Sequence, residues 1–244
     1  MSQSTLLQTL FDQSNAFTAF TMDQLAPIVI IFFFAGMVIY HQKKFGSKNS
    51  QRFIGAGLAT ITTIAVLSRM LFTSMDGSFT IEAELPIHLC RLMAFILPFA
   101  MFTKNRYWLG LSYFIIIAGT LQALITPDLP LSSPHYSYYI YWILHGFLFV
   151  LPFYIIIVYG LIPTKKDLWN AFIILNIYAA FTILINCILN SNYFYTWHKP
   201  EAASLLDYLG PWPIYIVAVE LIGLLFFYIA YLPIMYLNKV KRDI

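Results

Sequence analysis

Seven apolar segments constrain this chain more than any other feature, because each is close to the length that crosses a bilayer. A spanning helix needs about 20 mostly apolar residues to cover a hydrocarbon core of about 30 Å. The segments run Leu25–Tyr40, Phe53–Leu71, Leu85–Phe102, Tyr107–Ile125, Tyr138–Gly160, Leu168–Leu189 and Trp212–Leu237. Only 10% of the 244 residues are charged, against about 25% in soluble domains. We therefore predict an all-α, polytopic membrane protein in which residues 1–244 form a single seven-helix domain.

The basic residues gather in alternate connections and so predict how the helices are oriented. Cytoplasmic loops of membrane proteins carry an excess of Lys and Arg. Eleven of the fourteen basic residues lie on one side of the predicted bundle, namely Lys43, Lys44, Lys48, Arg52, Lys104, Arg106, Lys165, Lys166, Lys239, Lys241 and Arg242. The connections on the other side hold mainly acidic residues, with Lys199 as their one cation. We predict a multi-pass protein of the cell membrane with its N-terminus outside and its C-terminus in the cytoplasm.

The composition also bears on the N-terminal segment and on possible partners. Met1 to Asp23 has no Lys or Arg, so it does not have the pattern of a signal peptide. We expect residues 1–24 to lie outside the membrane, with Thr5–Phe20 as an interfacial amphipathic helix. The two cysteines have no zinc-binding spacing, and no basic patch is interleaved with aromatic residues. We therefore expect no metal, no cofactor and no nucleic-acid partner.

Most costly polar side chains fall in the outer half of the predicted bundle. His145 lies roughly 10 Å and Glu220 roughly 12 Å below the outer surface, from the rise per residue. The others at comparable levels are Arg69, His88, Cys90, Arg91, Gln122, Asn186 and Asn190. Ionisable groups inside a bilayer are expensive and usually face the interior of the bundle or a water-filled cavity. We interpret the set as a polar pocket open to the outer leaflet. Structural hydrogen bonds between helices are the alternative for any single residue.

Cys90 is the best candidate for a nucleophile in this set. A thiol becomes reactive when a base or a positive charge favours its thiolate. Arg91 is adjacent in sequence, and the positive end of the helix dipole acts in the same direction. His88 is about 200° round the helix from Cys90, so we favour His145, from another helix, as the base and His88 as an orienting residue or second proton carrier. The alternative is that Cys90 only fills space in the core, as most buried cysteines do.

The remaining polar residues suggest how a lipid substrate is held. Arg69 and Arg91 match the geometry of a phosphate, although pairing with Glu220 or Asp207 is the alternative. Amide side chains are candidate donors to an oxyanion. We assign that role to Gln122, Asn186 or Asn190. We assign the orientation of the histidine, or the balancing of the arginine charges, to Asp128, Asp207 and Glu220, and the rim of the pocket to Trp212.

Three stretches of the sequence resemble a known family. They are LPIHLCRLMAFILPFAMF (85–102), GTLQALITPDLP with YYIYWILHG (119–130 and 138–146), and NSNYFYTWHKPEAASLLDYLGPWPIY (190–215). The stretches are similar to the bacterial YwaF-type integral membrane proteins, which are related to the animal transmembrane protein 164 family. That family implies transfer of a fatty acyl group between phospholipids through a cysteine acyl-enzyme with a histidine partner. By position in the matching stretches, the family's cysteine corresponds to Cys90 and its histidine to His145. The resemblance also implies that the protein lies in a bacterial cytoplasmic membrane.

These observations lead to one predicted function and two alternatives. Acyl-CoA and ATP are absent from the outer side, so we predict CoA-independent transacylation from a phospholipid or another acyl-lipid. The first alternative is a transporter for lipids or small molecules, which requires a polar path through the inner half. That half is rich in Phe, Ile and Leu. The second alternative is a sensor or assembly partner without chemistry.

The predicted orientation can be measured with reporter fusions. Because the C-terminus is predicted to be cytoplasmic, a green fluorescent protein fused there is expected to fluoresce. Alkaline phosphatase at the same position is expected to be inactive, and active when fused after Ser133. The opposite pattern of activities would reverse the orientation.

Overall fold

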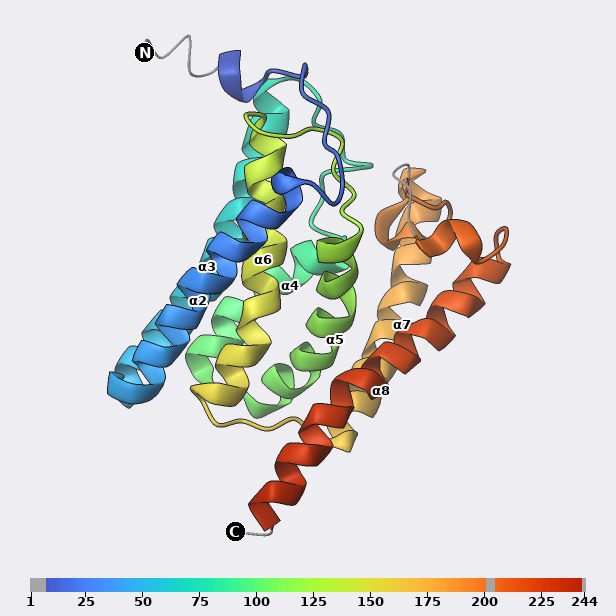
Figure 1. The fold of residues 1–244 in the computed structure, drawn as a ribbon. Coiled ribbons are helices and arrows are strands. Elements are labelled where there is room, and N and C mark those ends of the chain that lie inside the picture. The colour runs from blue at the N-terminus through green and yellow to red at the C-terminus, as the bar shows by residue number, and fades with distance from the viewer. Residues whose placement is uncertain (1–7, 201–204, 243–244) are drawn as a thin grey trace.

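The computed structural model describes residues 8–200 and 205–242 (Figure 1). The long helices are α2 (Met22–Phe45), α3 (Lys48–Met75), α4 (Leu89–Thr103), α5 (Arg106–Ile125), α6 (Tyr136–Ile157), α7 (Lys165–Leu189) and α8 (Ile214–Arg242). Two short 3-10 helices, η1 (Tyr193–Tyr195) and η2 (Leu205–Tyr208), lie between α7 and α8. The described residues contain no strand, only an isolated bridge between Ala16 and Leu131. The all-α prediction is confirmed, and no predicted helix end differs from the observed one by more than five residues.

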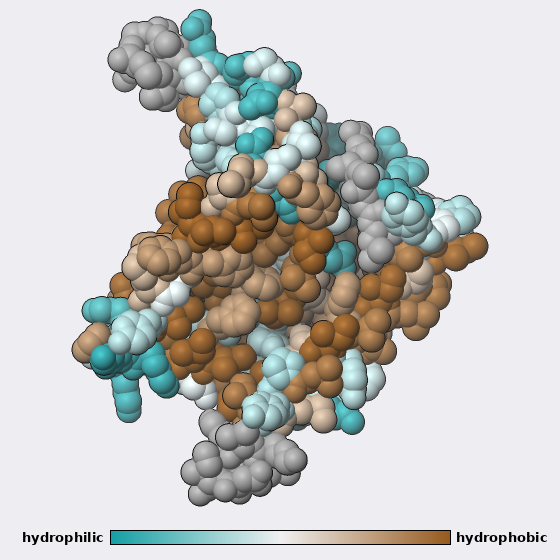
Figure 2. Space-filling view, viewed as in Figure 1, coloured by the Kyte–Doolittle hydropathy of each residue, from teal (hydrophilic) through white to brown (hydrophobic). Residues whose placement is uncertain are grey.

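The surface of the molecule fits a protein that lies in a bilayer. Six helices are long and apolar enough to cross a membrane, and α4, with 15 residues, is shorter. Figure 2 shows apolar residues across the middle of the molecule and hydrophilic residues gathered towards its ends. Only 11% of the most apolar window of α7 is buried, against 61% for α5. Helix α5 is therefore central, whereas α7 presents most of its apolar surface to the surroundings.

Helix α4 differs from the prediction in a way that positions the site. It begins at Leu89 instead of Leu85, and the non-helical stretch 76–88 leads down into the bundle (Figure 1). Tyr178, about 17 Å below the C-terminal end of α7, donates a hydrogen bond to the carbonyl of Ile87. Pro86 contributes to the late start, because a proline disfavours helical geometry in the residue before it. Cys90 consequently lies near the middle of the bundle and not at its mouth.

The N-terminal segment is also different from the expected interfacial helix. Of the described part, residues 8–10 are helical and residues 12–17 are not. The amide of Phe17 donates to the carbonyl of Pro130 at 3.0 Å, and the amide of Ser132 donates to the carbonyl of Asn15 at 2.9 Å. One backbone donor and one acceptor of this segment thus pair with the connection between α5 and α6, where an interfacial helix was expected. Residues 1–7 lie outside the described chain.

The half of the bundle beyond Cys90 is densely packed. Side chains from α4, α5 and α6 that are at most 1% exposed fill it, namely Leu97, Met101, Leu109, Leu111, Phe114, Leu151 and Tyr154. Tyr154 donates its hydroxyl proton to the carbonyl of Gln51 at 2.7 Å, so the polar group of this buried ring is satisfied. The described residues of this half therefore form an apolar seal below the site.

Close packing of α2 against α6 generates a first test of the fold. A Cβ atom at Gly146 would lie 2.6 Å from Cδ1 of Ile31, whereas one at Gly36 would meet nothing within 4 Å. Gly146→Val is expected to destabilise the protein by about 1–3 kcal/mol, the usual cost of overpacking. Gly36→Val, at an exposed position of α2, is the matched control. Thermal unfolding in detergent measures both, and equal melting temperatures would contradict this packing of α2.

Candidate active site

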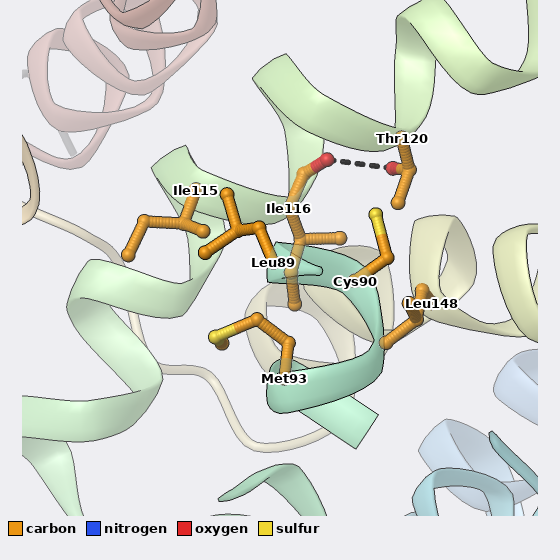
Figure 3. A pocket seen from close by; sticks show the side chains of 7 residues that line it. All are labelled: Leu89, Cys90, Met93, Ile115, Ile116, Thr120 and Leu148. Carbon is orange, nitrogen blue, oxygen red and sulfur yellow. Dashed lines mark hydrogen bonds between the residues drawn. The ribbon is translucent and has the colours of Figure 1, made fainter. Parts of the chain in front are cut away.

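Cys90 lies in the first turn of α4 and lines a small apolar cavity (Figure 3). The cavity has a volume of about 10 Å³, close to the minimum that a water molecule needs. Its walls are Leu89, Cys90 and Met93 of α4, Ile115, Ile116 and Thr120 of α5, and Leu148 of α6. Figure 3 shows the sulfur of Cys90 pointing towards Thr120, whose hydroxyl donates to the carbonyl of Ile116 at 2.6 Å. The thiol is thus held between three helices, in a cavity whose walls carry no charged side chain.

His145 is held on α6 by its own helix. Its Nδ1 is 3.0 Å from the carbonyl oxygen of Tyr141, and the two rings lie 4.2 Å apart between centroids. A carbonyl oxygen only accepts, so Nδ1 carries the proton and the neutral ring keeps its lone pair on Nε2. The side chain therefore has the tautomer that a general base needs.

The Cys90 cavity relates His145 to Cys90. Leu148, a wall of that cavity, lies three residues after His145 and so occupies the same side of α6. Arg91 follows Cys90 directly in the first turn of α4. The thiol, the imidazole and a guanidinium are thus carried by turns of α4 and α6 that border the same cavity.

Glu84 joins the two arginines into one ion cluster around a buried carboxylate. Its carboxylate accepts hydrogen bonds from Nε and Nη2 of Arg69 at 2.8 and 2.7 Å. Nη1 of Arg91 lies 3.3 Å from Oε2 of the same carboxylate, the oxygen that also accepts from Nε of Arg69, and donates to the carbonyl of Ala83 at 2.9 Å. Glu84 is only 3% exposed, and two cations against one anion leave a surplus of one positive charge. The cluster therefore fixes the stretch before α4 and keeps a positive potential beside Cys90.

Aromatic side chains from the connection between α7 and α8 enclose His88. This residue precedes α4 as its N-cap, and its ring lies 5.3 Å from that of Tyr193 and 5.4 Å from that of Tyr195. Tyr195 donates its hydroxyl proton to Oδ2 of Asp128 at 2.6 Å. Burial, and then the nearby Asp128 carboxylate, raise the pKa of Tyr195, so its hydroxyl stays protonated at neutral pH. His88, Tyr195 and Asp128 thus form a chain of contacts from the start of α4 towards the exposed loop.

Comparison with known proteins identifies the family. The sequence pattern of the TMEM164 family matches residues 16–231. The chain belongs to the TMEM164 family. The match covers all seven long helices except the last part of α8, and it includes Cys90, His145 and the ion cluster. No curated protein and no solved structure matches the chain significantly.

The predicted amide residues of this TMEM164-family chain lie at the ends of α5 and α7. Asn186 is 1% exposed and binds the loop after α7, donating to the carbonyl of Tyr193 and accepting from its amide. Its side chain also bonds Thr196 and Ser191, so every donor and acceptor of the amide is used. Asn190 is the exposed C-cap of α7 with φ 52°, and Gln122 is half-buried in the last turn of α5. Of the three, Asn186 is committed to holding the loop.

The other predicted binding residues lie apart from the arginines. Glu220 of α8 accepts a hydrogen bond from Nδ2 of Asn176 at 3.0 Å. Asp207 is exposed in η2, and its carbonyl accepts from Nζ of Lys199 at 3.4 Å. Trp212 stacks on Trp197 at 5.5 Å and donates to the carbonyl of Thr196. Among the described residues, both arginines therefore pair with Glu84, and neither forms the expected ion pair with Glu220 or Asp207.

The cavity itself corrects the expectation of an open polar pocket. Apart from Cys90 and Thr120 its walls are apolar side chains. The polar residues of this TMEM164-family chain bind one another instead, in the ion cluster and in the loop held by Asn186. Among the described residues, no group of three or more His, Cys, Asp or Glu side chains is placed to hold a metal ion.

Sequence reasoning missed Glu84, Tyr141, Tyr193 and Tyr195. Glu84 counted only as an acidic loop residue, yet its position within seven residues of Arg91 and before a short apolar helix was an available signal. The tyrosines carry no such signal, because their spacing in sequence does not indicate which rings meet His88 or His145.

The ion cluster generates a second test. Removing one member of a buried ion pair costs about 3–5 kcal/mol, because the remaining charges stay buried without a partner. Glu84→Gln is therefore expected to lower the free energy of unfolding by about that amount. Glu82→Gln, an exposed carboxylate two residues earlier, is expected to change it by less than about 0.5 kcal/mol. Chemical unfolding in detergent measures both, and equal effects would show that Glu84 does not hold the cluster together.

Proposed function

We propose that the protein is a membrane-embedded acyltransferase that moves a fatty acyl group between lipids through a thioester on Cys90. The observation that carries the proposal is that Cys90 of α4 and Leu148, one turn after His145 on α6, line the same cavity, with Arg91 next to Cys90 in α4. Membership of the TMEM164 family and the cysteine and histidine that the resemblance implies support the same pair. In the proposed roles Cys90 is the nucleophile and His145 is the base.

The first half-reaction forms the acyl-enzyme. An apolar wall favours the neutral thiol, so a base is needed. Nε2 of His145 takes the thiol proton, and Sγ of Cys90 attacks the ester carbonyl of a phospholipid. The tetrahedral intermediate collapses as the C–O bond of the ester breaks, and His145 returns the proton to the leaving alcohol. A lyso-lipid leaves, and the acyl group remains on sulfur.

The second half-reaction repeats these steps in reverse with another lipid. His145 takes the proton of the acceptor hydroxyl, whose oxygen attacks the thioester carbonyl. The C–S bond breaks, and the thiolate recovers its proton from His145. No oxidant, reductant or nucleotide is consumed, which suits a site supplied with acyl groups only by membrane lipids.

The start of α4 offers donors for the oxyanion of both intermediates. The side chain of His88 does not cap the helix, so the first backbone N–H groups of α4, those of Leu89, Cys90 and Arg91, receive no side-chain cap from it. Backbone N–H groups at a helix N-terminus stabilise negative charge through hydrogen bonds and through the helix dipole. We assign the oxyanion role to these amides, with Gln122 and Asn190 as the remaining side-chain candidates and Asn186 as support for the loop.

The ion cluster is proposed to bind the phosphate of the substrate. The side chain of Arg69 is 32% exposed, and that of Arg91 is 13% exposed. Glu84 neutralises only one of their two positive charges. A phosphate can use the remaining N–H groups of the two guanidinium forks. Asp128 acts through Tyr195 on the position of His88, and Trp212 with Trp197 forms part of the loop surface beside the site.

A substrate needs more room than the cavity provides in this conformation. Met93 is a flexible wall that can change rotamer. Only a small share of α7 and α8 is buried, 11% and 17% of their most apolar windows. We propose that a lipid enters laterally between this helical hairpin and α5. In the predicted orientation this entry faces the outer leaflet.

The transporter alternative receives no support from the packing. A transport path would have to cross the apolar seal described above, in which Leu97, Met101 and Tyr154 are at most 1% exposed. The chemistry proposed for Cys90 needs access from one side only.

Covalent trapping tests the proposed nucleophile. Membranes that contain the full chain are incubated with a phospholipid whose acyl chain carries an alkyne, and the labelled protein is detected after denaturation. We expect the label to be sensitive to hydroxylamine, lost in Cys90→Ser, and at least about tenfold weaker in His145→Ala. Cys187→Ser is the matched control, because Cys187 is a free, exposed cysteine on α7. Full labelling of Cys90→Ser, or loss of label in the control, would contradict the assignment.

A further inference from the structure

The end of the bundle opposite the loops around His88 carries a group of cations that have no acidic partner among the described residues. Lys48 and Arg52 lie one turn apart at the start of α3, and Lys104 is the C-cap of α4 with φ 52°. None of the three forms an ion pair with a described residue. Asp167, the one carboxylate in the described part of this end, is bound by Arg106 at 2.7 Å and by Thr164. We call Lys48, Arg52 and Lys104 the basic corner.

Aromatic rings hold two members of the basic corner in place. The guanidinium carbon of Arg52 lies 4.2 Å from the ring centroid of Phe102, and Nζ of Lys104 lies 4.5 Å from that of Tyr159. Tyr159 is itself fixed by a hydrogen bond from its hydroxyl to the carbonyl of Met101 at 3.0 Å. Such cation–π contacts orient the side chains but leave their N–H donors unused. The cations are thus positioned by rings and not by acceptors.

One buried donor of the basic corner lacks an acceptor among the described residues. Nε of Arg52 is buried and has no hydrogen-bond partner among the described residues, although buried polar groups in folded proteins are nearly always bonded. Burial lowers the pKa of Lys104, and the positive charges of Arg52 and Lys48 lower it further. The mutual repulsion of these cations therefore raises the free energy of the folded protein, and a bound anion would reduce that repulsion.

We propose that the basic corner binds the phosphate of an anionic glycerophospholipid. A phosphate oxygen supplies the acceptor that Nε of Arg52 lacks, and one negative charge relieves the repulsion among the three cations. Phe53 and Phe102 beside the corner are 60% and 36% exposed, so acyl chains attached to the phosphate find apolar surface next to it. A zwitterionic headgroup fits less well, because it adds a fourth cation. The site is separated from Cys90 by the apolar seal, and it does not rest on the proposed enzyme activity.

Native mass spectrometry of the full chain in a neutral detergent tests the proposal. Phosphatidylglycerol, phosphatidylcholine and inorganic phosphate are added separately, and the bound fraction is measured. We expect phosphatidylglycerol to bind preferentially, and Arg52→Gln with Lys104→Gln to weaken its binding about tenfold or more. Lys43→Gln with Lys44→Gln is the matched control, since it removes two exposed charges from the same end and is expected to change binding less than about twofold.

Three results would overturn the proposal. They are equal losses in the two double variants, equal binding of phosphatidylcholine, and binding of inorganic phosphate that matches the lipid. The first would mean general attraction to charge, and the last would mean a site for free phosphate. If the double variant does not fold, as judged by gel filtration, Lys104→Gln alone is compared with Lys44→Gln.

Discussion

Backbone that is not helical can lie at membrane depth only where the protein itself supplies its hydrogen bonds. The stretch before α4 meets this requirement through side chains from distant parts of the chain. Tyr193 donates to the carbonyl of Ile81 at 2.5 Å and accepts from the amide of Leu85, and Tyr178 satisfies Ile87. Arg91 completes the set by donating to Ala83. The depth of α4, and with it the position of Cys90, depends on these bonds.

The same stretch explains how two arginines are tolerated beside an apolar cavity. Charged groups are expensive there unless they are paired. Glu84 pairs with both, and it can do so because the chain before α4 descends far enough to bring its carboxylate beside Arg69. A helix that began at Leu85, as predicted from the sequence, would continue the apolar segment outwards and leave no such loop. The late start of α4 and the ion cluster are therefore two aspects of one arrangement.

The sequence predicted the elements well and their contacts less well. Length and hydropathy place helices such as α5 and α7 within a few residues, because the bilayer sets how many apolar residues a crossing needs. They do not locate the start of α4, which depends on partners such as Tyr178 that are more than eighty residues away. Cys90 and His145 were selected from residue type, depth and resemblance. Glu84, the partner of both arginines, was not predicted from the sequence, because charge pairing between a loop and distant helices depends on the tertiary structure.

The dense packing between Cys90 and the basic corner has an electrical consequence. Water and ions cannot follow a chain of side chains such as Leu97, Met101 and Tyr154, which leave almost no exposed surface. An apolar layer has a low dielectric constant and holds no mobile ions, so a voltage applied across the bundle would fall mainly across this half. The buried arginines, histidines and glutamate on the other side of it would then experience little of that voltage, and substitutions that hydrate the layer would change this whether or not they alter Cys90.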